Sequence, residues 1–305
     1  LIMFFKNLKV YKITEQLGLT TAKLEAALAE HKFNPCMGQD ALKMGFCYPM
    51  HPSVKSFAHA VNDDNLIVVA LRRQEKLLPA AVINEELQPK IDALEAEKGR
   101  PLGRKEKQVL KEEMIQTLLP RAFSRSTVTT AVIDQANGFV FVNTSSASRA
   151  EDLLALLRKS LGSLPVVPWV DSNFLCQRMQ EWLSGKNLPA GIKLGHAARL
   201  KAPDEEGARA SFENHILTAD EVQSHLEDKL VTELDLQIPE LFEFRITETG
   251  TFKRLRWEEL LTNKNDELGW EDLLLRLDAD YLLMVNQLRE VIKVVGESVS
   301  PVVKS

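Results

Sequence analysis

The chain has 305 residues, and its 43 acidic and 38 basic side chains give a formal net charge of −5. Hydrophobic residues make up 45% and charged residues 27%, as in an ordinary globular protein of about two domains. No apolar run approaches the roughly 18 residues of a membrane helix, and the short apolar start lacks a signal-peptide pattern. Three cysteines form no even disulfide framework. We therefore expect a cytoplasmic protein with no membrane partner.

The first third of the chain predicts strands and one helix. Loose alternation over residues 4–13 predicts a strand, and Thr20 or Thr21 can cap a helix that buries Leu24 and Leu28. Residues 33–52 contain glycines and prolines without a steady period, which predicts a long loop. Residues 66–71 form a continuous apolar run, as expected of a strand covered on both faces.

A helical hairpin is predicted next. Its helices are separated by the break Gly-Arg-Pro-Leu-Gly at residues 99–103, which supplies a helix stop and a chain reversal. The hairpin has few apolar positions for its length, so we expect it to project from the protein. Its two apolar stripes are Leu87, Ile91 and Leu94 in the first helix and Leu110, Met114 and Leu118 in the second.

A β-hairpin and another helix complete the N-terminal half. Strands over residues 128–134 and 139–144 flank the Asn137-Gly138 pair, which is a strong hairpin signal. A capping box from Ser148 to Glu151 predicts a helix that runs to Leu161 and ends at Gly162. Residues 164–168 then predict an extended connector and a domain boundary.

The C-terminal half mixes helices and strands. We expect helices over residues 174–183, from a capping box at Thr218 to about 228, and over 279–295. Strands are expected at 231–238, 241–247 and 252–257. The predicted class is α+β, with mixed sheets, flanking helices and the projecting helical hairpin. We divide the chain into a central domain (1–77 and 119–165), the hairpin or finger domain (78–118) and a C-terminal domain (166–305).

Positive charge is concentrated in residues 98–125, where eight basic and three acidic side chains give +5 within an acidic protein. Charge segregated in this way indicates a polyanion partner such as DNA. The alternative is a solvated helix tip with Lys–Glu pairs, as most charge runs are. The candidate phosphate contacts on the hairpin are Arg100, Arg104, Lys105, Lys107 and Lys111.

Further candidates follow the hairpin. Arg121 and Arg125 flank Phe123, which can be core, a stacking platform for a base, or an interface anchor. Arg149, Arg158 and Lys159 belong to one predicted helix. Arg149 and Arg158 either face a phosphate track or simply cover the polar side of that helix.

Catalytic motifs are missing from the sequence. It has no phosphate-binding Gly-x-x-x-x-Gly-Lys-[Ser/Thr], no dinucleotide-binding glycine fingerprint and no Gly-x-Ser-x-Gly elbow. Cys36, Cys47 and His51 fit no zinc spacing, and Glu30-His31-Lys32 lacks the upstream aspartate of a metal-dependent nuclease. We expect no catalytic residue, no metal and no cofactor, and hence not an enzyme.

Five blocks of the sequence, in order along the whole chain, resemble the RdgC family of bacterial recombination-associated proteins. Asp278-Ala279-Asp280 before a late apolar helix fits the same pattern. The blocks are Phe4-Phe5-Lys6-Asn7-Leu8, Lys43-Met44-Gly45-Phe46, Glu75-Lys76-Leu77-Leu78-Pro79, the run from Leu118 to Arg125 and the run from Arg158 to Pro168.

The resemblance implies a ring-shaped homodimer whose positively lined hole holds duplex DNA, and also single-stranded DNA, with little sequence preference. It implies that the protein restrains the RecA recombinase, has no catalytic activity and is associated with the nucleoid. Arg100 matches a position at the finger tip, Lys229 a lysine near the hole, and Phe123 one of two dimer contacts. The alternative is a protein-interaction module that inhibits RecA directly through the acidic residues 204–243, with DNA binding incidental.

Overall fold

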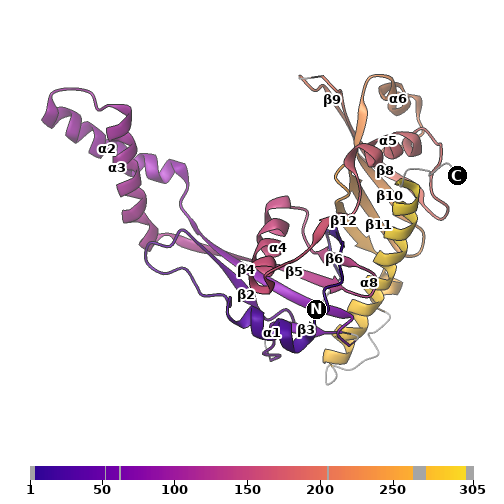
Figure 1. Cartoon of the computed structure of the whole chain (residues 1–305). Helices are drawn as coiled ribbons and strands as arrows, with labels where there is room; N and C mark the ends of the chain where they lie inside the picture. The colour runs from indigo at the N-terminus through magenta and orange to yellow at the C-terminus, as the bar shows by residue number, and fades with distance from the viewer. Residues whose placement is uncertain (1–3, 52, 62, 205, 264–272, 300–305) are drawn as a thin grey trace.

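The computed structural model describes residues 4–51, 53–61, 63–204, 206–263 and 273–299. Figure 1 shows an open U: a helical hairpin forms one arm, a first β-sheet the base and a second β-sheet the other arm. The α+β class and the helical hairpin are thereby confirmed. None of the helices in these ranges has the length and apolar character needed to cross a membrane.

The first sheet has seven antiparallel strands in the order β2-β4-β5-β6-β1-β7, with β3 paired to β4. Its longest pair, β4 and β5, is registered over its whole length, from Leu66 opposite Asp134 to Leu77 opposite Phe123. The strands are β1 (Lys9–Ile13), β2 (Leu42–Cys47), β3 (Ala58–Ala60), β4 (Leu66–Leu77), β5 (Phe123–Asp134), β6 (Phe139–Val142) and β7 (Val166–Pro168).

Both faces of the first sheet are buried, as the apolar run in β4 predicts. Leu66 and Val68 face a large core shared with the C-terminal half, whereas Ile67 and Val69 face a second core. The second core is covered by α1 (Thr21–Ala29) and α4 (Ala147–Leu161). The alternation follows from the two-residue period of a strand, so β4 contributes to both cores at once.

The second sheet has five antiparallel strands in the order β12-β11-β10-β8-β9. One face is apolar and packs against α5 (Ser172–Leu183) and α8 (Leu273–Val299). The other face presents mostly polar side chains, including Arg199, Glu233 and Arg245. The strands are β8 (Lys193–Lys201), β9 (Arg209–Phe212), β10 (Leu230–Ile238), β11 (Phe242–Thr247) and β12 (Phe252–Trp257).

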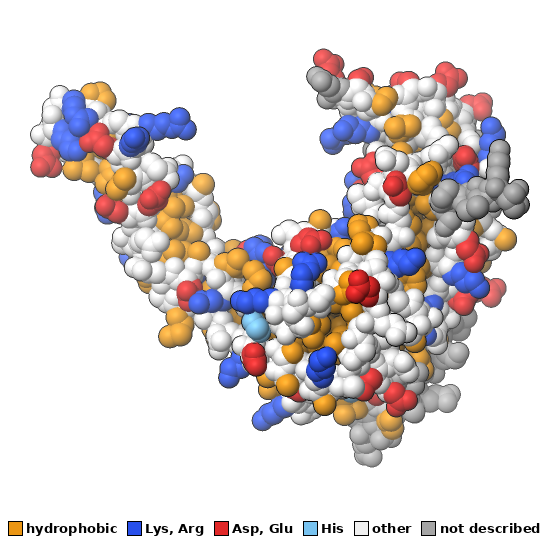
Figure 2. Space-filling model, viewed as in Figure 1, with side chains coloured by type: hydrophobic (Ala, Val, Ile, Leu, Met, Phe, Trp, Pro, Cys, Tyr) orange, Lys and Arg blue, Asp and Glu red, His pale blue; other side chains and the backbone are white. Residues whose placement is uncertain are grey.

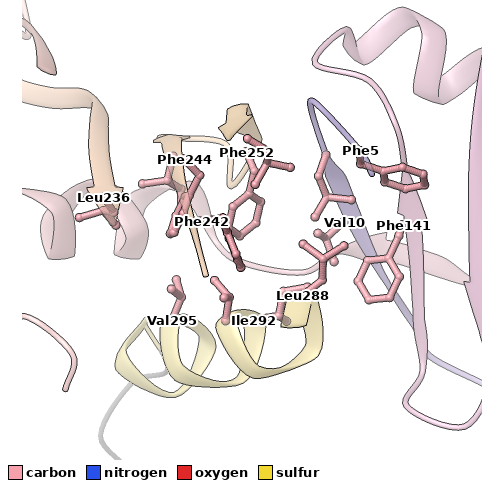
Figure 3. Close-up of a cluster of buried hydrophobic side chains, with 14 of the residues drawn as sticks. Phe5, Val10, Phe141, Leu236, Phe242, Phe244, Phe252, Leu288, Ile292 and Val295 are labelled. Atoms are coloured by element: carbon pink, nitrogen blue, oxygen red, sulfur yellow. The ribbon is translucent and has the colours of Figure 1, made fainter. Parts of the chain in front are cut away.

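Helix α8 joins the two sheets. Leu288, Ile292 and Val295 lie on one stripe of the helix. Figure 3 shows Ile292 and Val295 beneath side chains of the second sheet and Leu288 on the side of Phe141 of the first. Polar contacts anchor the helix to the first sheet as well. Arg289 Nε donates to Asp134 Oδ2 at 2.7 Å, and His59 Nε2 lies 2.6 Å from Asp278 Oδ1.

The projecting hairpin consists of α2 (Ala80–Lys98) and α3 (Arg104–Leu118), with a short 3₁₀ turn, Leu119–Arg121, before β5. The predicted stripes meet in a small core of their own, centred on Leu87, Ile91 and Met114. Gly99 ends α2 with a φ of 63°, a left-handed conformation that favours glycine. The hairpin is carried at the far end of the β4–β5 ribbon (Figure 1).

Several sequence-based elements need correction. The loop expected over residues 33–52 contains strand β2, and Pro52 lies outside the described residues. Helix α4 begins after Ser146, whose Oγ accepts from the Arg149 N–H, rather than at Ser148. Thr218 does not cap a helix either: α6 (Asp220–Gln223) starts after Ala219 and continues as the 3₁₀ turn Ser224–Glu227.

Strands β8 and β9 were not predicted, and β5 and α8 extend beyond their predicted ends. In β8 the glycine and histidine at 195 and 196 interrupt the alternation that marks a strand. The connector predicted at 164–168 includes β7, which pairs with β1 of the first sheet. A short helix, α7 (Glu259–Thr262), follows β12. The division into three domains remains a prediction.

A charge network crosses the polar face of the second sheet. The Arg245 side chain is only 2% exposed, and its two Nη atoms donate to the Glu213 carboxylate at 2.9 Å each. Arg245 Nη2 also donates to Asp235 Oδ2 at 3.1 Å. These hydrogen bonds lower the pKa of Glu213 to about 2. The network joins Arg245 of β11 to Asp235 of β10 and to Glu213, the residue directly after β9.

We expect Arg245→Met to destabilise the protein by about 3 kcal/mol, because it keeps the volume but leaves Asp235 and Glu213 without their shared partner. The free energy of unfolding from urea titration measures this loss. Arg254→Met is the matched control: Arg254 is 55% exposed and reaches Glu213 only at 3.4 Å. Its cost should stay below about 1 kcal/mol. Equal costs for the two variants would contradict the assigned role of Arg245.

Candidate nucleic-acid interface

The two arms and the base of the U enclose a hollow. Figure 2 shows Lys and Arg side chains on the hairpin arm, on the floor of the hollow and on the inner edge of the second-sheet arm. Acidic side chains are interspersed, many of them on the outer side of the view. The surface bordering the hollow is therefore the place to look for a polyanion site.

At the hairpin tip, much of the predicted positive charge is neutralised by Glu106. Its carboxylate accepts from Lys98 Nζ at 2.7 Å and from the Arg100 guanidinium at 2.9 and 3.1 Å. It also accepts from the Gly103 N–H at 2.9 Å, which caps α3. The hydrogen bonds from Arg100, Lys98 and Gly103 hold the pKa of the Glu106 carboxyl far below its ordinary value. Arg100 is thus a paired cation.

A second acid organises the same loop. Glu95 Oε1 accepts from the Leu102 N–H at 2.8 Å and pairs with Lys107 Nζ at 3.1 Å. Arg104 and Lys105 are exposed and make no ion pair with a described residue, while Lys111 is half-buried. Two of the five predicted tip contacts, Arg104 and Lys105, are thus exposed and unpaired.

The base of the hairpin carries Arg121, Phe123 and Arg125. Arg125 lies directly across the ribbon from Glu75, and its Nε donates to Glu75 Oε1 at 3.1 Å. Arg121 is exposed at the end of the 3₁₀ turn. Phe123 is 84% exposed, so it is not a core residue.

Phe123 belongs to an apolar patch. It lies opposite Leu77, which is 42% exposed, and side chains directly opposite in a strand pair share one face. Leu42 and Met44 of β2 extend the same face and are 38% and 36% exposed. We call these four residues the ribbon patch. Exposed apolar patches of this kind mark interaction sites.

Helix α4 carries Arg149, Arg158 and Lys159, all exposed. Arg149 and Arg158 are nine positions apart, which is two and a half turns. They therefore lie on opposite sides of α4 and do not form a single phosphate track. Lys229 is also poorly placed for a phosphate, since its side chain is 10% exposed and its Nζ bonds Asp228 at 2.7 Å.

A group of cations that the sequence reasoning missed surrounds a cleft of about 670 Å³ between the two sheets. They are far apart in the sequence, and the fold brings them together from β1 of the first sheet and from β8, β9 and β12 of the second. The sole sequence signal was the basic run at residues 253–256. The cations are Lys9, Arg199, Lys201, Arg209 and Lys253.

The described part of the chain holds no group of three or more His, Cys, Asp and Glu side chains placed to bind a metal ion. Cys36, Cys47 and Cys176 are all free thiols. Burial raises the pKa of the Cys47 and Cys176 thiols, so these two are less reactive than an ordinary cysteine.

These features define an α+β protein with a concave, partly basic surface and a helical finger carried on a β-ribbon. A family model described as "Putative exonuclease, RdgC" matches residues 3–300. Proteins named "Recombination-associated protein RdgC" from Yersinia pestis (strain Pestoides F) and Yersinia enterocolitica (serotype O:8 / biotype 1B) are each 42% identical to this chain over 293 residues, covering 96% of both proteins in each case. The chain belongs to the RdgC family, and it is a recombination-associated protein by that relationship.

Glu106→Ala should loosen the hairpin tip, because it removes the cap of α3 and the partner of Lys98 and Arg100. Hydrogen exchange of backbone amides over residues 99–107 should become several-fold faster. Glu112→Ala on the same helix is the control, since Glu112 is exposed and accepts only from Gln108. Unchanged exchange in Glu106→Ala would show that the ion pairs do not organise the tip.

Proposed function

We propose that this protein binds DNA without sequence preference as a ring-shaped homodimer, and that it thereby restrains RecA-mediated recombination. Two U-shaped subunits facing each other would enclose the hollow of each and create a hole. The proposal places the protein at the nucleoid and assigns it no catalytic activity. The observation that carries it is the concave surface with cations on both arms, in a chain that belongs to a recombination-associated family.

The charge distribution supports this function. A protein with net charge −5 can bind DNA when its cations face the hollow, because local rather than total charge sets the field at a surface. Phosphate contacts of this kind position the protein but carry no sequence information.

Subunit contact is proposed at the ribbon patch. Phe123 is a large aromatic side chain at the base of the hairpin arm, and aromatic anchors dominate the energetics of protein interfaces. Leu77, Met44 and Leu42 would form the surrounding apolar contact.

Binding to duplex DNA should weaken steeply with salt, with the same slope for unrelated sequences. The reason is counterion release: log K falls with log [salt] by about 0.9 for each phosphate contacted. Fluorescence anisotropy over a salt series measures the slope, and DNA recovered from reactions with added magnesium should be uncut. A flat salt response would refute the DNA-binding proposal.

The alternative is that the protein inhibits RecA directly and that its DNA binding is incidental. Charge reversal at Arg104, Lys105 and Arg100 distinguishes this alternative from inhibition through DNA binding. If the triple Glu variant loses DNA binding but still inhibits RecA strand exchange, direct inhibition is correct. The structure offers this alternative limited support: the acids Glu213, Glu233 and Asp235 of its acidic segment are already paired with cations of the same sheet.

Phe123→Ala should weaken the dimer by about 2–4 kcal/mol, the loss typical of a buried aromatic anchor. Sedimentation equilibrium over a dilution series measures the dissociation constant. Val128→Ala is the control, because Val128 is 51% exposed on the same ribbon but on the opposite face. If both variants dimerise like the wild type, Phe123 is not at the subunit contact.

A further inference from the structure

The cleft between the two sheets has a charge arrangement that the fold itself does not explain. Lys201 of β8 and Arg209 of β9 are directly opposite each other in an antiparallel pair, on the same polar face. Like charges in that position destabilise a sheet. Both side chains are exposed, and neither makes an ion pair with a described residue. An anion held between them would remove the repulsion.

The local backbone holds this pair in place. The β8–β9 hairpin is closed by a hydrogen bond from the Ala202 N–H to the Ala208 carbonyl at 2.8 Å. Gly207 has a φ of 58°, and a Cβ at this position would lie 2.6 Å from Lys201 Cε. The Lys201 stem therefore passes over a glycine that leaves room for it.

The opposite wall of the cleft supplies further donors. Lys9 Nζ donates to Thr251 Oγ1 at 2.9 Å, and burial lowers the pKa of Lys9. Ser145 and Ala147 at the start of α4 line the same cleft. The first-turn amide of Ala147 has no acceptor within the helix, so it can donate to an anion in the cleft.

The acids in the cleft do not cancel this charge. Glu233 is occupied by Lys253 Nζ at 2.6 Å and by Arg199 Nη1 at 3.6 Å. Glu248 also lines the cleft, and Glu151 lies near Lys9. The cleft is therefore lined by five cations, Lys9, Arg199, Lys201, Arg209 and Lys253, but by only two acids, Glu233 and Glu248.

We propose that this cleft is a phosphate-binding site, with Lys201 and Arg209 on one wall and Lys9 and the start of α4 on the other. Two sources of phosphoryl oxygens fit this chemistry: consecutive backbone phosphates of DNA in the hollow, or a free polyphosphate. The DNA source rests on the proposed function, whereas the free-phosphate source does not. The site is distinct from the hairpin tip and the ribbon patch.

The test compares Lys201→Ala/Arg209→Ala with the control Lys23→Ala/Lys55→Ala, which removes the same charge from exposed positions that do not line the cleft. Each protein is titrated with a short duplex over a salt series and with tripolyphosphate by thermal shift. Because the cleft variant relieves like-charge repulsion, its melting temperature without ligand should equal or exceed that of the wild type.

We expect the salt slope for DNA to fall by about two in the cleft variant, one for each phosphate contact, and to be unchanged in the control. The rise in melting temperature with tripolyphosphate should also be lost. Loss of the tripolyphosphate effect with unchanged DNA binding would support the site and identify a free phosphate ligand. If the cleft variant matches the control with both ligands, the proposal is overturned.

If the wild type binds no DNA, the proposed function is refuted. The tripolyphosphate titration then still shows whether the cleft binds phosphate.

Discussion

The angle between the two sheets depends on the apolar stripe of α8. This helix buries Leu288, Ile292 and Val295 against aromatic side chains of one sheet and the underside of the other, so neither sheet has a complete core without it. Burial of each such side chain contributes on the order of 1.5–3 kcal/mol, and the contribution is lost if the sheets separate. The width of the hollow is thus set by hydrophobic packing on the far side of the base, away from the charged surface.

The net charge of the surface is decided in different ways at the hairpin tip and at the junction of the two sheets. At the hairpin tip, acids close in sequence fold back onto the cations, as Glu106 does with Lys98 and Arg100. At the junction of the sheets, strand pairing places Lys201 beside Arg209, while Glu233 pairs with Lys253 and Arg199. Charge counted along the sequence therefore overestimates the positive electrostatic potential at the hairpin tip and underestimates it at the junction of the sheets.

The elements with a strong period could be predicted from sequence. The run at Leu66 to Leu71, the paired stripes of α2 and α3 and the Asn-Gly hairpin before β6 all appear as expected, because each is specified by neighbours in the chain. Strand β8 was missed, and with it the cations at the junction. Its identity as a strand depends on pairing with β10, some thirty residues away, which no local pattern encodes. Phe123 was recognisable as a candidate, but its exposure was decided by the register of the ribbon.

The ribbon has a mechanical consequence. Beyond Leu71 and Thr129 the strands β4 and β5 leave the buried part of the sheet, and the last pairs, near Leu77 and Phe123, are not flanked by β2. At about 3.3 Å per residue the twelve-residue ribbon is roughly 40 Å long. The six residues beyond Leu71 span roughly 20 Å, so a bend of about 10° at that point moves the end of the ribbon by about 3.5 Å. The helical hairpin is thus attached through a two-stranded ribbon, and the stiffness of this ribbon comes from backbone hydrogen bonds rather than from a packed core.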